Sequence, residues 1–147
     1  MSGSSRRPKA RSFVDYSLQR RAALVALARG ATSTRDLCDA DPYLVRAARF
    51  HGEPIHRRCP VCRTRELALL RYVFSDELGK LSGRIKSAQE VVELSREYGA
   101  VSVYVVEVCR RCAWNHLLAS YVVGDGVARR RSRAGVAAGD RADEYGD

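Results

Sequence analysis

Residues 59–62 read Cys-Pro-Val-Cys and residues 109–112 read Cys-Arg-Arg-Cys, and the chain is organised around these two motifs. Two residues between paired cysteines allow a tight turn to aim both sulfurs at one point. Zn²⁺ prefers four ligands in a tetrahedron and binds thiolates well, so two such turns facing each other would complete one site. Two CxxC motifs in a chain with five cysteines support this interpretation more strongly than one motif would. The predicted ligands of a structural Zn²⁺ are Cys59, Cys62, Cys109 and Cys112.

Three segments beside the motifs have the composition of β-strands. Residues 67–74 leave the first motif, residues 101–108 enter the second, and residues 113–123 leave it. All three are rich in β-branched and aromatic residues, which suit a pleated sheet. A capping box at Ser87 predicts a helix over residues 87–98, within the long segment between the motifs. We therefore expect an α+β fold whose three-stranded antiparallel sheet with an inserted helix resembles the zinc ribbon.

Other interpretations of the cysteines remain open. A structural disulfide would suit an oxidising compartment, which nothing in the sequence indicates. A redox pair would need a thiolate activated by a helix N-terminus or a cation, whereas each motif leads into strand-like sequence. Core cysteines without a metal are a third alternative, and His56 or His116 could replace one cysteine as a ligand. Four thiolates leave no open position, which is typical of structural rather than catalytic zinc.

One position in each turn departs from the common zinc-ribbon pattern. Many such turns place glycine directly after the second cysteine, where glycine adopts a positive φ at least cost. Arg63 and Ala113 occupy these positions here. The departure weakens the match to the nucleic-acid-binding ribbons but leaves the metal prediction in place.

Composition divides the chain into four parts. Residues 1–11 are polar and basic, and we expect them to be disordered. Residues 12–52 form an expected helical segment, and residues 53–124 form the expected zinc-ribbon-like domain. Residues 125–147 combine an arginine cluster with an Ala/Gly/Asp tail, and we expect them to be flexible.

Helix signals predict two or three helices before residue 52. An apolar face runs through residues 12–29, with Ser12 as the expected N-cap. Asp41, followed by proline, marks the start of a helix over residues 42–51 that Gly52 closes. A further helix of about two turns is expected between them, begun by a serine or threonine cap.

These helices with tight turns resemble a helix-turn-helix core. Its last helix would offer Arg46 and Arg49 to DNA. The alternative is a helical annex that packs on the ribbon. Cys38, at a helical position, is expected to be a small buried apolar residue rather than a metal ligand.

The charge of the chain favours an acidic partner. The net charge is +9, and residues 1–30 carry seven Lys and Arg against one acid. Residues 53–66 carry four Arg against two acids, beside the first motif. No stretch reaches the roughly 18 uncharged apolar residues of a membrane span, and no apolar run follows the basic start as in a signal peptide. We therefore expect a cytoplasmic protein that does not bind membranes.

Several stretches resemble a family of small actinobacterial proteins of uncharacterised function. The resemblance covers about residues 12–123 and implies no activity; zinc is indicated by the cysteines alone. The residues that carry it include Asp36-Leu37-Cys38-Asp39-Ala40, Pro42-Tyr43-Leu44, His51-Gly52-Glu53-Pro54, the first cysteine motif, Asp76-Glu77-Leu78-Gly79, and Tyr104 to Cys109 with Trp114-Asn115-His116-Leu117.

Two functional hypotheses follow. The first is a non-enzymatic zinc protein that associates with nucleic acid or with a nucleic-acid machine such as RNA polymerase or the ribosome. Its predicted phosphate contacts are Arg57, Arg58, Arg63, Arg65, Arg110 and Arg111, which flank the cysteines. The second is a protein-interaction adaptor in which the ribbon is purely structural. No Gly-rich phosphate loop, Ser/His/Asp set or open metal site indicates an enzyme, and the acidic pair Asp76-Glu77 has no evident catalytic partner.

Overall fold

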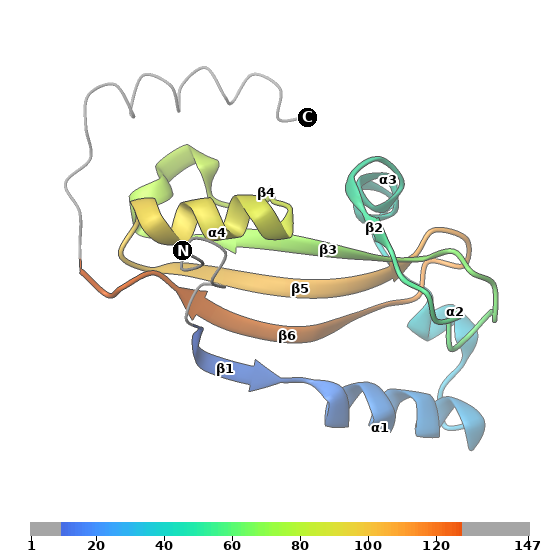
Figure 1. Cartoon of the computed structure of the whole chain (residues 1–147). Coiled ribbons are helices and arrows are strands. Elements are labelled where there is room, and N and C mark those ends of the chain that lie inside the picture. The colour runs from blue at the N-terminus through green and yellow to red at the C-terminus, as the bar shows by residue number, and fades with distance from the viewer. Residues whose placement is uncertain (1–9, 128–147) are drawn as a thin grey trace. The chain divides into compact units, whose positions relative to one another are not determined.

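The computed structural model describes residues 10–127, which form helices, a 3-10 helix and strands (Figure 1). The expected terminal tails lie mostly outside these residues. In chain order the elements are β1 (Arg11–Asp15), α1 (Ser17–Ala28), α2 (Thr34–Leu37), α3 (Pro42–His51), β2 (Glu53–Pro54), β3 (Leu67–Phe74), the 3-10 helix η2 (Asp76–Leu81), β4 (Arg84–Ile85), α4 (Ala88–Glu97), β5 (Val101–Cys109) and β6 (Asn115–Val123).

The strands of the described residues form one six-stranded antiparallel sheet in the order β1-β6-β5-β3-β2, and β4 also pairs with β3 (Figure 1). The three strands expected from the sequence are β3, β5 and β6. The expected three-stranded sheet is nevertheless wrong, because β1, β2 and β4 extend it. Strands β2 and β4 have two residues each, too few for any periodic pattern, and their pairing with β3 sets them: Glu53 opposes Leu69, and Ile85 opposes Tyr72.

The first helix begins later than the sequence predicted. Residues 11–15 are the strand β1 rather than helix, and Ser12, the expected N-cap, has a φ of 52°. The Asp15 carboxylate instead accepts the Ser17 N–H at 2.8 Å at the true helix start. The Tyr16 N–H donates to the Leu118 carbonyl at 3.0 Å. Pairing with β6 therefore overrides the local helical pattern of this segment.

The predicted caps of α3 and α4 are confirmed. The N-cap of α3 is Asp41, Pro42 occupies its first turn, and Gly52 ends it. The capping box of α4 is present, with Ser87 as N-cap. The middle helix α2 is four residues long, about one turn rather than the expected two. A glycine is required at position 52, because an added Cβ would lie 2.4 Å from the Ala48 carbonyl oxygen.

The chain divides into two compact units. One contains, of the described residues, 10–13, 71–103 and 121–127, and its buried side chains include Val73, Val91 and Val101. The other contains residues 14–70 and 104–120, and therefore all five cysteines. We call this second part the cysteine unit. Among residues 10–127 no helix combines the length and apolar character needed to cross a membrane.

The cysteine unit has its own core. Cys59, Leu67, Cys109 and Trp114 are fully buried and cluster together. Partly buried side chains from α1, from α2 and from the cysteine turns pack against them. The helical segment and the cysteine turns thus share one core, which fixes the turns against their neighbours.

Candidate metal centre

Both CxxC motifs fold into the same tight turn. In the first turn the Arg63 N–H donates to the Cys59 carbonyl at 3.0 Å, and in the second the Ala113 N–H donates to the Cys109 carbonyl at 3.1 Å. Arg63 and Ala113 have φ values of 68° and 72°. The positive φ that the sequence pattern required is therefore present at both positions, although neither residue is glycine. Holding a non-glycine residue there costs roughly 1–2 kcal/mol, so each turn adopts this shape against local preference.

The turns direct backbone N–H groups at sulfur. The sulfur of Cys59 accepts two N–H bonds from its own turn at 3.4 and 3.5 Å. The sulfur of Cys109 accepts two from the second turn, both at 3.4 Å. Donors aimed at sulfur favour its charged form, the thiolate that binds metals. Each turn therefore places two N–H donors around the sulfur of its first cysteine.

The four sulfurs converge on one point. All four lie within 4.8 Å of one another. Cys59 and Cys112 are 3.7 Å apart, and Cys62 and Cys109 are 3.6 Å apart. A tetrahedron with metal–sulfur bonds of about 2.3 Å has sulfur–sulfur edges of about 3.8 Å, so these two distances fit a tetrathiolate ion such as zinc. They are far longer than the roughly 2.05 Å of a disulfide bond, and all five cysteines are free.

The charge balance of the cluster also calls for a cation. Burial raises the pKa of Cys59, of Cys112 and of Cys38 above the usual thiol value. Burial also acts to raise the pKa of Cys62, but hydrogen bonds from Thr64 and neighbouring cysteines outweigh it and lower that pKa to about 6. Four thiolates this close together repel one another, so the full set ionises only when a positive ion balances it.

The fifth cysteine also reaches the cluster. Cys38 follows α2, and its thiol donates to the Cys112 sulfur at 3.5 Å. It is half-buried rather than buried, and it does not belong to the group of four. His56 is exposed, and His116 stacks on Trp114 with its Nδ1 2.7 Å from the Leu117 carbonyl oxygen. Neither histidine is part of the four-residue cluster.

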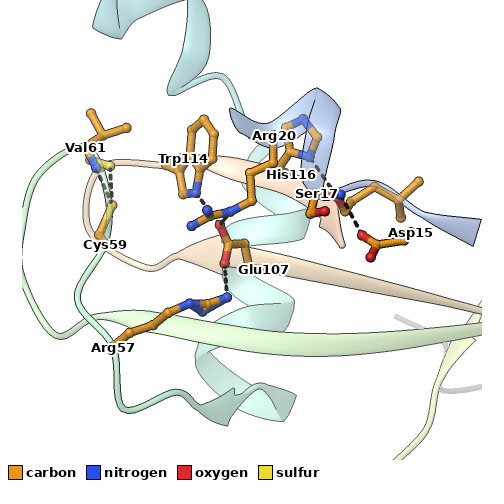
Figure 2. Close-up of polar contacts among 11 residues, drawn as sticks. Asp15, Ser17, Arg20, Arg57, Cys59, Val61, Glu107, Trp114 and His116 are labelled. Carbon is orange, nitrogen blue, oxygen red and sulfur yellow. Dashed lines mark hydrogen bonds and ion pairs between the residues drawn. The ribbon is translucent and has the colours of Figure 1, made fainter. Parts of the chain in front are cut away.

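A buried carboxylate beside the cluster was missed by the sequence reasoning. Glu107 lies on β5 and is fully buried. Figure 2 shows its contacts with Arg20, Arg57 and Trp114. Its Oε1 accepts from Arg57 at 2.6 Å, and its Oε2 accepts from Arg20 at 2.7 Å and from the Trp114 indole at 2.8 Å. The signal was the single charged residue of this strand, because such a charge is buried only when it is paired.

This network joins the first helix to both cysteine turns. Arg20 lies on α1 and also sits over the Trp114 ring, 6.0 Å from its centroid. Arg57 precedes the first turn by two residues, and Trp114 follows the second. Arg57 was predicted to contact phosphate, but one of its guanidinium nitrogens is committed to Glu107 while its side chain is 45% exposed. The geometry therefore supports a structural role for Arg57, in which it balances the charge of Glu107.

The other candidate arginines divide by what they contact. Arg58 donates to the Arg63 carbonyl at 3.0 Å, and Arg110 pairs with Glu66 at 3.4 Å. Within residues 10–127, the guanidinium groups of Arg63, Arg65 and Arg111 have no acidic partner, and all three residues are exposed. These three are the predicted contacts that remain available to a ligand.

Glu77, one residue of the acidic pair at the start of η2, makes structural contacts. The Glu77 carboxylate accepts the Gly99 N–H at 2.9 Å. The Glu77 N–H in turn donates to the hydroxyl of the N-cap Ser75 at 3.1 Å. Glu77 thus helps to fix the turn after β3, which accounts for its position without a catalytic role.

Comparison with known proteins gives a family but no activity. The model of a family of unknown function, DUF5318, matches residues 7–137. The uncharacterised proteins Rv0049 of Mycobacterium tuberculosis and Mb0050 of Mycobacterium bovis are each 47% identical to this chain over 111 residues, which are 76% of this chain and 81% of theirs. No solved structure matches the chain. The expected resemblance to a family of uncharacterised function is confirmed, and these relatives are mycobacterial.

Proposed function

This chain belongs to DUF5318, a family of unknown function, and we propose that it is a zinc-stabilised nucleic-acid-binding protein. A structural Zn²⁺ held by Cys59, Cys62, Cys109 and Cys112 would fix an arginine-rich surface that binds the phosphate backbone. The observation that carries the proposal is the convergence of four sulfurs from two identical turns inside the most basic part of the described chain.

Zinc is favoured by the donor set. Four thiolates in a tetrahedron suit Zn²⁺ or an iron–sulfur centre, whereas Mg²⁺ and Ca²⁺ prefer oxygen ligands. Cys59 and Cys109 are fully buried and Cys62 and Cys112 are half-buried, and together their four thiolates would fill the coordination sphere of the ion. A closed site of this kind supplies folding energy and has no open coordination position for a substrate. The proposal therefore assigns the metal a structural role.

The distribution of charge supports nucleic acid as the partner. The cysteine unit contains twelve Arg, no Lys and seven acids, a net charge of +5. The described residues of the other unit contain six Lys and Arg and six acids, a net charge of zero. Even with the charge of −2 that four thiolates and one Zn²⁺ add, the cysteine unit stays positive. Exclusive use of arginine suits phosphate, because its planar fork binds phosphate oxygens in pairs.

Two cysteine variants test which residues bind the metal. Cys112→Ser removes one of the four ligands, whereas Cys38→Ser removes the adjacent fifth cysteine. Purified protein with Cys38→Ser should retain one equivalent of zinc, and protein with Cys112→Ser should lose most of it. Metal content is measured by elemental mass spectrometry on freshly purified protein. Equal loss in both variants, or a wild-type protein without zinc, would refute the four-ligand assignment.

The binding role is tested with zinc-loaded protein and short fluorescent single strands of RNA and of DNA. Anisotropy should show binding that weakens steeply as salt rises, because each neutralised phosphate releases counterions. Lys86→Gln removes one positive charge from the other unit and should change affinity little. Absence of binding to either strand at low salt would refute the role.

The adaptor alternative also has support. Tyr43 and Phe50, on α3, are 79% and 74% exposed. Large exposed aromatic side chains are typical of protein interfaces, although they can also stack on bases. A protein partner that is recovered equally well before and after nuclease treatment, and is lost with Phe50→Ser, would favour the adaptor. Loss of every co-purifying partner on nuclease treatment would favour nucleic acid.

A further inference from the structure

We propose that the cavity between α3 and the two cysteine turns is the pocket that receives a backbone phosphate of the bound strand, an inference that rests on the proposed nucleic-acid-binding function. Its volume is about 550 Å³. This lies within the roughly 300–1,000 Å³ of ligand pockets and exceeds the needs of a single ion. The cavity is lined by Arg49, Thr64, Glu66, Arg110 and Arg111, all of which belong to the cysteine unit.

Three of the residues that line this phosphate pocket belong to the cysteine turns or directly follow them. Arg110 and Arg111 are the two residues between the paired cysteines of the second turn. Thr64 follows the first turn, and its hydroxyl lies 3.1 Å from the sulfur of Cys62. A metal that clamps the two turns together would therefore also set the width of the pocket. This gives the metal a direct influence on binding without any contact between metal and ligand.

The third arginine is held in place from outside the turns. Arg49 lies in the last turn of α3, and its Nη2 donates to the Arg110 carbonyl at 3.3 Å. That bond uses one of the five N–H donors of the guanidinium group. The others remain for a ligand. The helix α3, which was predicted to offer Arg49 to DNA, thus places Arg49 beside the two arginines of the second turn.

The charge of the lining favours an anion. Three arginines face one carboxylate, and Glu66 pairs with Arg110 at 3.4 Å. The Arg111 guanidinium has no hydrogen-bond or ion-pair partner among residues 10–127. The pocket therefore carries a net charge of +2, with two guanidinium groups available.

A second cavity in the other unit provides a contrast. Its volume is about 630 Å³, and the charged residues that line it are Asp76 and Glu77. A cavity alone would not indicate a phosphate, because this one is of similar size and acidic. The arginines distinguish the first pocket, and phosphate is the oxyanion whose geometry matches paired guanidinium forks.

The experiment compares charge removal inside and outside the pocket. Arg49→Gln, Arg111→Gln and the double variant are titrated with the labelled single strands across a range of salt. Arg21→Gln, which removes an exposed arginine of the cysteine unit that neither lines the pocket nor belongs to the predicted phosphate contacts, is the matched control. Each pocket variant should weaken binding about tenfold, as expected for a lost charge-assisted contact.

The double variant reports whether the two arginines share one ligand. Because both would contact the same phosphate, the double variant should lose less than the product of the two single effects. The salt slope should fall by about 0.7 for the one phosphate contact that is lost. Arg21→Gln should weaken binding by less than threefold. Equal effects of all three single variants, with independent losses in the double variant, would overturn the pocket while leaving nucleic-acid binding intact.

A direct probe separates the pocket from the function. Inorganic phosphate is added to the zinc-loaded protein, and amide chemical shifts are followed by NMR. Changes centred on Thr64 and Arg111, and absent with Arg49→Gln, would show a phosphate site even if no strand bound. Localised shifts without strand binding would refute the proposed nucleic-acid-binding function. The pocket would then remain a site for free phosphate rather than for the backbone phosphate of a strand. No strand binding and no localised shift would refute both.

Discussion

Glu107→Gln keeps the size and shape of the side chain but removes its charge, and we expect it to destabilise the protein strongly. Glu107 is fully buried and accepts hydrogen bonds from two arginines and one indole. Glutamine keeps the volume but has one acceptor oxygen and one NH₂ donor group. Whichever way the amide is oriented, its NH₂ faces an arginine donor. The variant also leaves two guanidinium groups without their shared counter-charge.

The magnitude follows from burial. Breaking a buried ion pair by removing one partner costs roughly 3–5 kcal/mol. The Arg20 side chain is 22% exposed and the Arg57 side chain is 45% exposed, so water can solvate the second of them in part. We therefore expect a loss near the lower end, about 3 kcal/mol. If the free energy of unfolding falls by about 1.5 kcal/mol for each molar increase in urea, this loss lowers the urea concentration at the unfolding midpoint by about 2 M.

Urea unfolding of zinc-loaded protein, followed by the fluorescence of the single tryptophan, measures this loss directly. Trp114 is itself part of the network, so its signal reports on the affected region. Glu93→Gln, on the exposed side of α4, removes the same charge and should change stability by less than about 0.5 kcal/mol. A loss below about 1 kcal/mol for Glu107→Gln would refute the idea that this carboxylate balances both arginines.

Three further predictions concern the turns and their metal. Ala113→Gly should stabilise the protein by about 0.5–1 kcal/mol, because Ala113 has a φ of 72°; a lower melting temperature would contradict this. Gly52→Ala should destabilise by about 1–3 kcal/mol in urea unfolding, because its Cβ would meet the Ala48 carbonyl at 2.4 Å; an unchanged midpoint would contradict the close packing. Zinc affinity, measured by chelator competition, should fall as pH falls, because burial raises the pKa of Cys59 and Cys112 and protons then compete with the metal; an affinity independent of pH would contradict thiolate ligation.

Much of the cysteine unit was predictable from local chemistry. The CxxC spacing predicted turns that face one another, and the four sulfurs lie within 4.8 Å. The need for a positive φ after each second cysteine was also visible, and the structure has it at Arg63 and Ala113. The helix caps at Asp41 and Ser87 were equally local signals, because cap residues satisfy backbone groups of the same short segment.

What the sequence did not reveal depends on pairing between distant segments. Residues 12–15 belong to the predicted helical pattern, yet they form part of β1 because β6, near the end of the described chain, offers an edge. The partners of Glu107 come from position 20, position 57 and position 114, and no spacing rule connects them. The pocket arginines were recognised separately, as helix and turn residues, but their meeting depends on how α3 packs. Tertiary contact decided each of these cases.

X-ray absorption at the zinc edge, on protein purified without added metal, tests the central claim most directly. The account predicts one zinc per chain with four sulfur neighbours at about 2.3 Å and no nitrogen or oxygen ligand. A chain without zinc, or a zinc with fewer than four sulfurs in its first shell, would contradict the assignment of Cys59, Cys62, Cys109 and Cys112 as one structural site.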